Sequence, residues 1–209
     1  MISQNDKKNK WAWFSPINVV FLAHLVVIGL VVAGLMPRGV VPFWTLVLAA
    51  YVLWASLEDS TTFFVRSIPF FIAIPITTGF DSLNMWRILS GLIFLKWFWQ
   101  TNWLTKLKSH VTLTDDRIRM SYLIRSWFKN NRATTLLLFL LTLAILSIAQ
   151  APSHTLAIKR IIYFVNLSLI GIVIHDLAKK NQNFSQRLIK NIAIPTIIVV
   201  LIGIVQLGS

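Results

Sequence analysis

Long apolar runs constrain this chain more than any other feature. A membrane-crossing helix needs about 20 mostly apolar residues, and in lipid each backbone amide must find its partner within the segment. Runs of suitable length and composition recur seven times, which predicts an all-α fold: a polytopic transmembrane helix bundle forming a single domain over residues 1–209. The predicted spans are 17–35, 41–57, 61–80, 85–103, 133–150, 161–177 and 192–208.

Composition excludes several other classes of protein. Of 209 residues, 56% are hydrophobic and 13% are charged, whereas an ordinary soluble domain is about a quarter charged. The chain has no cysteine, and its four histidines lack metal-ligand spacing, so we expect no disulfide, metal site or cofactor. A net charge of +13 would suggest nucleic acid in a soluble protein. Here the apolar runs argue against a nucleic-acid partner and for a charge difference across a membrane.

The distribution of Lys and Arg predicts the orientation. With a cytoplasmic N-terminus and seven crossings, fifteen of these cations lie inside and four outside, as the positive-inside rule requires. The third span contains Pro69 and Pro75, and the alternative is a re-entrant segment, which gives a split of seven cations against twelve with the N-terminus outside. The more uneven distribution of cations favours a third span that crosses the membrane. Arg66 is then near the cytoplasmic end of that span and able to reach the headgroups.

The polar stretch before the fifth span predicts an interfacial helix over about 114–132. Its apolar residues recur at helical spacing on one face, while most of its cations lie on another. Such a helix is expected to lie on anionic membrane lipids. The apolar residues are Met120, Leu123, Ile124, Trp127 and Phe128.

Histidine and tryptophan positions have structural interpretations. We expect His24, within the first span, to be packed and hydrogen-bonded, and His175 with Asp176 to form a solvated helix end. Tryptophans cluster where the first span begins and the fourth ends, which is typical of an aromatic belt at a membrane interface. They are Trp11, Trp13, Trp97, Trp99 and Trp103.

The few cations outside the cytoplasmic loops are the candidate site residues. Arg87 and Arg160 lie at the outer ends of the fourth and sixth spans, where a guanidinium can bind phosphate through two hydrogen bonds. The alternative is a headgroup anchor, or a pair between Arg87 and Asp81. Lys96, which should face the bundle interior, and Arg66 are second-rank candidates. No catalytic residue is identified.

Three stretches of the sequence carry a resemblance to a known family. Residues 56–77 read SLEDSTTFFVRSIPFFIAIPIT and residues 80–89 read FDSLNMWRIL, and residues 158–163 (IKRIIY) open a span. The chain resembles the amino-terminal half of bacterial O-antigen ligase family membrane proteins. The resemblance implies a bacterial inner-membrane glycosyltransferase of polysaccharide biosynthesis in the cell envelope. It would transfer a glycan from a polyprenyl-pyrophosphate carrier, without metal, on the outer side of the membrane.

The chain also departs from that family. Family members have about twelve spans and a large periplasmic loop with essential Arg and His, whereas this chain has seven predicted spans and no such loop. We therefore expect a fragment or a degenerate member. The alternatives are a transporter or flippase-like module, with Arg66, Lys96 and the Pro-containing span along a pathway, and a non-catalytic membrane scaffold.

Overall fold

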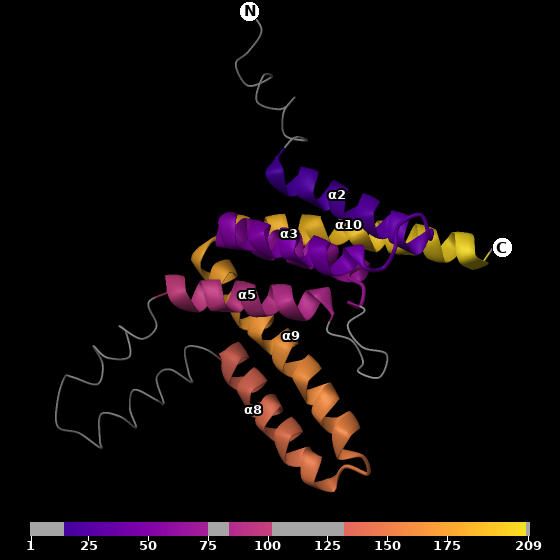
Figure 1. The fold of residues 1–209 in the computed structure, drawn as a ribbon. Helices are drawn as coiled ribbons and strands as arrows, with labels where there is room; N and C mark the ends of the chain where they lie inside the picture. Colours follow the sequence, from indigo (N-terminus) through magenta and orange to yellow (C-terminus); the bar gives the residue numbers. More distant parts are fainter. Residues whose placement is uncertain (1–14, 75–83, 102–131, 208–209) are drawn as a thin grey trace, which may run out of the picture. The chain divides into compact units, whose positions relative to one another are not determined.

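The computed structural model describes residues 15–74, 84–101 and 132–207, and these residues are almost entirely helical (Figure 1). The predicted all-α class is confirmed for this part of the chain, where the β-structure is one isolated bridge between Ala73 and Asn84. The chain divides into two compact units: unit 1 comprises Met1–Ile93 and Leu177–Ser209, and unit 2 comprises Phe94–Asp176.

Most helices begin where the apolar runs begin. Helices α2, α3, α5 and α8 start within one residue of their predicted spans, whereas α9 and α10 start seven and ten residues earlier. The predicted 114–132 helix lies outside the described residues except for Arg132, which opens α8. The helices are α2 Pro16–Val32, α3 Val40–Trp54, α4 Leu57–Ser67, α5 Met85–Gln100, α8 Arg132–Leu146, α9 His154–Lys180 and α10 Gln182–Leu207, with 3-10 turns η2 Ile68–Phe70 and η3 Ser147–Gln150.

Local sequence signals explain both ends of α2. Pro16 occupies its first position, where the missing N–H costs nothing because that donor has no helical acceptor. At the other end Gly34 has φ of 75°, a left-handed conformation that favours glycine. The Gly34 N–H donates to the Val31 carbonyl at 3.2 Å and the Leu35 N–H to the Leu30 carbonyl at 2.9 Å. This is a Schellman motif, and it ends the helix at the turn toward α3.

Within the third predicted span, 61–80, the helix is interrupted at the first of its two prolines, and residues 75–80 lie outside the described residues. Helix α4 ends at Ser67 and is followed by the 3-10 turn η2 and then extended backbone at Phe71. Pro69 explains the break, because its ring removes a backbone donor and clashes with the preceding turn. The chain then pairs Ala73 with Asn84, immediately before α5.

Helix α4 is the centre of unit 1. It contacts α2, α3 and α10, and seven of its eleven residues are buried although it is rich in Ser and Thr. The hydroxyls of Thr61 and Thr62 donate to carbonyls one turn back, at 2.8 and 2.7 Å. Ser60 donates to its own helix and to the Val52 carbonyl of α3, both at 2.8 Å. These bonds pair three of the four hydroxyls of this polar helix, and Ser67 Oγ is buried without a partner among the described residues.

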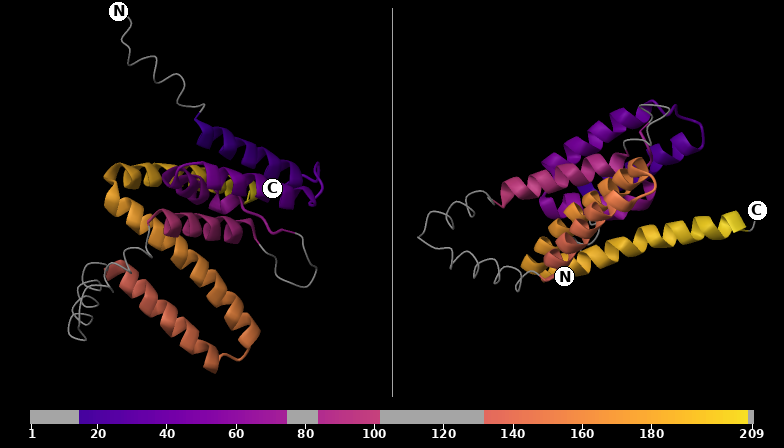
Figure 2. Two further views of the ribbon diagram at one scale, coloured as in Figure 1. Left: turned by 60° about the vertical axis from the view of Figure 1, so that its left-hand side comes forward. Right: turned by 90° about the horizontal axis from the view of Figure 1, so that it is seen from below.

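In unit 2, α8 and α9 form an antiparallel pair joined through η3, and they lie side by side in all the ribbon views (Figures 1 and 2). At Gly171 of α9, an added Cβ would lie 3.6 Å from Cδ1 of Leu137 on α8. That is an ordinary contact distance, so the two helices approach closely at this glycine.

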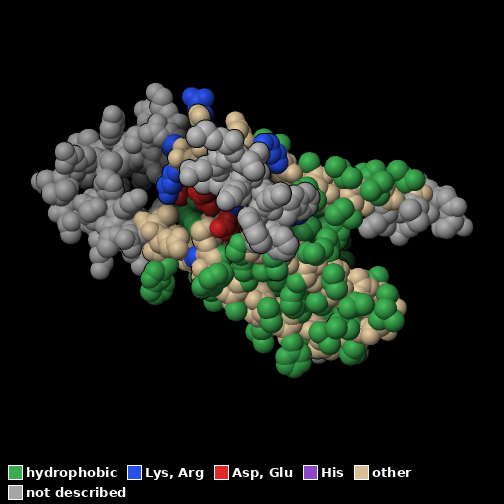
Figure 3. Space-filling view, turned by 90° about the horizontal axis from the view of Figure 1, so that it is seen from above, with side chains coloured by type: hydrophobic (Ala, Val, Ile, Leu, Met, Phe, Trp, Pro, Cys, Tyr) green, Lys and Arg blue, Asp and Glu red, His purple; other side chains and the backbone are tan. Residues whose placement is uncertain are grey.

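The described helices expose many large apolar side chains, and hydrophobic atoms dominate the described surface in Figure 3. Within the part of the chain that the structure describes, two helices are long and apolar enough to cross a membrane: His154–Lys180, and Gln182–Leu201 within α10. Only 22% and 11% of their most apolar windows are buried. Shorter apolar helices are Pro16–Val32, Val40–Trp54 and Thr135–Gln150. Membrane association is therefore supported by helix length and composition.

Candidate functional site

The two first-rank predicted site residues belong to different units. Arg87 is half-buried in the first turn of α5 in unit 1, and Arg160 is exposed near the start of α9 in unit 2. Asp81, the alternative partner of Arg87, lies outside the described residues. A phosphate site shared by Arg87 and Arg160 stays a prediction.

Arg66 is buried, and the prediction that it reaches the headgroups is wrong. Its side chain is 9% exposed, and its Nη1 donates to Oδ1 of Asn18 on α2 at 2.6 Å. The guanidinium carbon lies 3.9 Å from the centre of the Phe21 ring, a cation–π contact. A charge held between two helices in this way cannot also reach the surface. Lys96, the other second-rank candidate, is half-buried in unit 2.

His24 is packed and hydrogen-bonded, as predicted. It is fully buried, and its Nδ1 accepts a hydrogen bond from Nε1 of Trp44 at 3.0 Å. Its ring packs against Phe63 and Phe71, with ring centres 6.1 and 5.4 Å apart. Since Nδ1 is the acceptor, the neutral ring carries its proton on Nε2, which has no partner in the described part of the chain. His24 therefore joins α2 to α3 and α4.

The start of α4 is held by a helix cap and an ion pair that our sequence reasoning missed. Ser56 caps the helix: its hydroxyl accepts from the Asp59 N–H at 3.0 Å and donates to Asp59 Oδ2 at 2.8 Å. Arg187 of α10 pairs with Asp59 Oδ1. Burial alone would raise the pKa of Asp59, but the hydrogen bonds from Arg187 and Ser56 and the charge of Arg187 together lower it. Asp59 is therefore ionised at neutral pH and joins α4 to α10.

A second polar contact and apolar packing reinforce that junction. Asn181 caps α10 by accepting from the Asn183 N–H at 3.0 Å, and its amide donates to Glu58 at 3.1 Å. Phe184 of α10 is 1% exposed and anchors the same end of the helix. The Ser56-x-x-Asp59 spacing is a helix-start signal that could have been recognised in the sequence. The choice of Arg187 as partner, 128 residues away, has no comparable signal.

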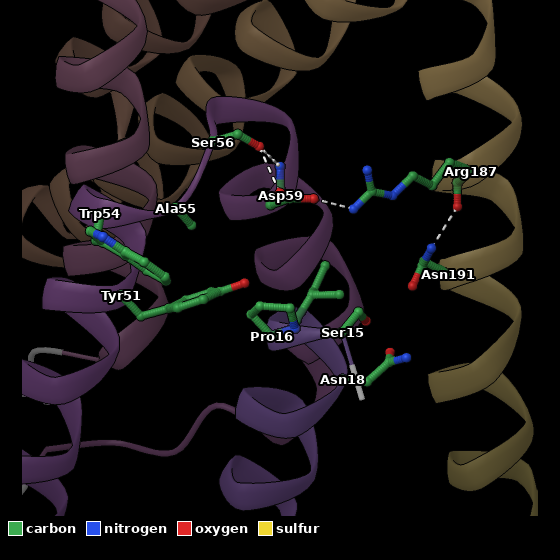
Figure 4. Close-up of a pocket in the computed structure, with 11 residues that line it drawn as sticks. Ser15, Pro16, Asn18, Tyr51, Trp54, Ala55, Ser56, Asp59, Arg187 and Asn191 are labelled. Carbon is green, nitrogen blue, oxygen red and sulfur yellow. Dashed lines mark hydrogen bonds and ion pairs between the residues drawn. The ribbon is translucent and has the colours of Figure 1, made fainter. Parts of the chain in front are cut away.

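A cavity of about 550 Å³ lies at this end of unit 1. It is bounded by the start of α2, the end of α3, the start of α4 and the first turns of α10 (Figure 4). The Tyr51 hydroxyl points into it from α3, opposite the Asp59–Arg187 pair. The lining residues are Ser15, Pro16, Ile17, Asn18, Tyr51, Trp54, Ala55, Ser56, Asp59, Arg187 and Asn191.

In unit 2, the aromatic-belt interpretation is wrong for Trp97. Its ring is 7% exposed, and its Nε1 donates to Asp176 Oδ2 at 2.7 Å. Asp176 is therefore not part of a solvated helix end, and α9 continues past it to Lys180. Trp99, two residues later, is 85% exposed and keeps the interfacial interpretation. The two rings point to different sides because successive helical residues are rotated by about 100°.

The described side chains offer charge and hydrogen bonding rather than a recognised catalytic constellation. No group of three or more His, Asp or Glu among them is placed to hold a metal ion. No protein-family model, curated protein or solved structure matches the chain. The resemblance to O-antigen ligase proteins stays a prediction.

Proposed function

We propose that this chain is a multi-pass protein of a bacterial inner membrane, with a cytoplasmic N-terminus, and that it acts on a polyprenyl-pyrophosphate-linked glycan. The membrane part of the proposal is supported by the outward apolar surface of α9 and α10, because a contiguous surface of this kind is a liability in water. The orientation is supported by the distribution of Lys and Arg.

In this proposal the broken α4–η2 segment forms the third crossing. Residues 61–67 of α4, the three residues of η2 and residues 71–74 reach about 30 Å if placed end to end. The hydrocarbon core is about 30 Å thick, so a broken segment of this length suffices to cross it. The bridge between Ala73 and Asn84 supports a position for the start of α5 at the far end of this proposed crossing.

The observation that carries the functional proposal is the burial of Arg66 in α4. A buried cation inside a membrane bundle is costly and by default indicates a site for a polar or charged substrate. Glycan transfer is the reaction that the sequence resemblance implies, with Arg87 and Arg160 as candidate contacts for the carrier phosphates. The break in the third crossing favours a second candidate, movement of the same class of substrate across the membrane, because transporters use discontinuous helices at their binding sites.

Cysteine labelling tests the topology, and the chain has no native cysteine to interfere. Single cysteines at positions 38 and 154 should react with a membrane-impermeant thiol reagent in intact cells, and one at position 182 should react only after permeabilisation. Reaction at 182 in intact cells would refute the proposed orientation.

Proteoliposomes containing the full chain and a fluorescent polyprenyl-pyrophosphate glycan separate the two activities. Transfer would convert added lipid acceptor into a labelled product, and that product should be lost in Arg87→Ala and in Arg66→Gln. Movement without transfer would expose label from the inner leaflet to a quencher added outside. If the wild-type protein neither forms the product nor moves the label, the functional proposal is contradicted.

A further inference from the structure

The cavity at the start of α4 is lined by one ion pair and adjoins a buried cation, Arg66, through the side chain of Asn18. Among the described charged groups, Asp59 and Arg187 line it and offset each other, since the two carboxylate oxygens of Asp59 are taken by Arg187 and Ser56. Arg66 stands directly behind the cavity, bonded to the amide of its lining residue Asn18. Arg66 forms no ion pair within the described residues, so one positive charge is left without a counter-charge.

The start of α2 adds to the positive electrostatic potential in the cavity. Ser15, Pro16 and Ile17 line the cavity, so the positive end of the dipole of a 17-residue helix faces the same space. A helix start adds about half a positive charge and favours an anion near its first turn. Together with Arg66, it gives the cavity a preference for a negatively charged group.

Tyr51 supplies an independent sign of a ligand. Its side chain is 8% exposed, and its hydroxyl points into the cavity (Figure 4). Its ring packs edge-on against Phe63, with ring centres 5.3 Å apart, and its hydroxyl forms no hydrogen bond with a described residue. The hydroxyl oxygen is open to the cavity, so it can donate to an acceptor that enters the cavity.

We infer that this cavity binds the phosphate group of an amphipathic anion. Donors lie on different walls, the Tyr51 hydroxyl on α3 and the Ser15 hydroxyl and helix start on α2, and a tetrahedral phosphate presents oxygens in several directions. Pro16, Ile17 and the 79% exposed ring of Trp54 form an apolar rim beside these donors. A volume of about 550 Å³ is typical of small-molecule sites.

This site differs from the carrier-phosphate contacts in the proposed function. Arg87 and Arg160 are expected at the outer leaflet, whereas the cavity adjoins the start of α2 and the first turns of α10, which the proposed topology places at the cytoplasmic side. The ligand is either the headgroup of an anionic membrane lipid or a soluble organic phosphate. Binding can be measured without any assay of glycan transfer, so failure of one proposal does not entail failure of the other.

The test uses the full chain, delipidated and reconstituted in nanodiscs of neutral phosphatidylcholine. Two probes are titrated, short-chain dioctanoyl phosphatidylglycerol and glycerol phosphate, and binding is measured by calorimetry. Saturable binding of the lipid alone assigns the site to a headgroup, and binding of glycerol phosphate with similar affinity assigns it to a soluble phosphate. If neither probe binds, the inference is overturned.

Matched variants locate the binding site. Tyr51→Phe removes only the hydroxyl, and we expect it to weaken binding about 10-fold, because a hydrogen bond to a charged acceptor is lost. Arg66→Gln should weaken binding at least as much while keeping a donor for Asn18. Tyr163→Phe in α9, outside the cavity, is the control and should leave affinity unchanged. Wild-type affinity in Tyr51→Phe would show that the probe binds elsewhere, and this overturns the inference even if Arg66→Gln fails to fold.

Discussion

The contact between Arg66 and Asn18 predicts an unusual order of mutational effects. Removing the small neutral partner should destabilise the protein more than removing the charge. In Asn18→Ala the guanidinium, which is 9% exposed in the native protein, keeps its charge but loses the acceptor that lies 2.6 Å from Nη1. A hydrogen bond to a charged group contributes about 1.5–3 kcal/mol, and a buried group left unsatisfied costs its desolvation as well. We therefore expect Asn18→Ala to cost about 2–3 kcal/mol.

Arg66→Met should cost less. It removes the cation–π contact with Phe21, about 1–2 kcal/mol at a desolvated site, but the methionine stem retains much of the apolar packing. Asn18 lines the cavity, so water can hydrate its amide once Arg66 is gone. The expected loss is about 1 kcal/mol, and the double variant should resemble Arg66→Met alone.

Unfolding of the purified protein in mixed micelles, followed by tryptophan fluorescence, measures these differences. Arg160→Met, at an exposed arginine of α9, is the control and should change stability by less than about 0.5 kcal/mol. If Arg66→Met were more destabilising than Asn18→Ala, the guanidinium would not be a buried charge that depends on Asn18, and the reasoning would be refuted.

Two further predictions concern other polar contacts. Trp97→Phe should destabilise the protein by about 1–3 kcal/mol in the same assay, because it removes the buried donor to Asp176. Trp99→Phe, at an 85% exposed ring, is the control and should have little effect. Equal effects of the two substitutions would contradict the hydrogen bond between Trp97 and Asp176. The lowered pKa of Asp59 means that the stabilisation from its pair with Arg187 is fully present above pH 4 and is lost as pH falls below that value. Both side chains are more than a third exposed, so Asp59→Asn should lower the free energy of unfolding by no more than about 1 kcal/mol at pH 6 and by less at pH 3. A larger loss of stability at pH 3 than at pH 6 would count against the pair.

The sequence alone determined where most helices lie. Apolar runs, prolines and glycines act over a few residues, and helical hydrogen bonds join residues only four apart. The position of a helix is therefore determined by the residues of its own segment. Pro16 and Gly34 therefore lie at helix ends that the structure shows close to the predicted span 17–35, whereas the cap at Ser56 was missed and α4 begins four residues before its predicted span. Over 61–80 the sequence marked Pro69 as a place of interruption, but the residue at which α4 ends is seen only in the structure.

The tertiary structure decided what each polar side chain contacts. Asn18 meets Arg66 across 48 residues, Trp97 meets Asp176 across 79, and Asp59 meets Arg187 across 128. A periodic pattern gives the face of a helix but not the helix that packs against it, so buried and lipid-facing polar residues look alike in sequence. Arg66 was therefore expected at the headgroups, yet packing of α4 among α2, α3 and α10 places it inside unit 1. The cavity at the start of α4 arises from the same packing, because its walls come from four helices that only the folded chain brings together.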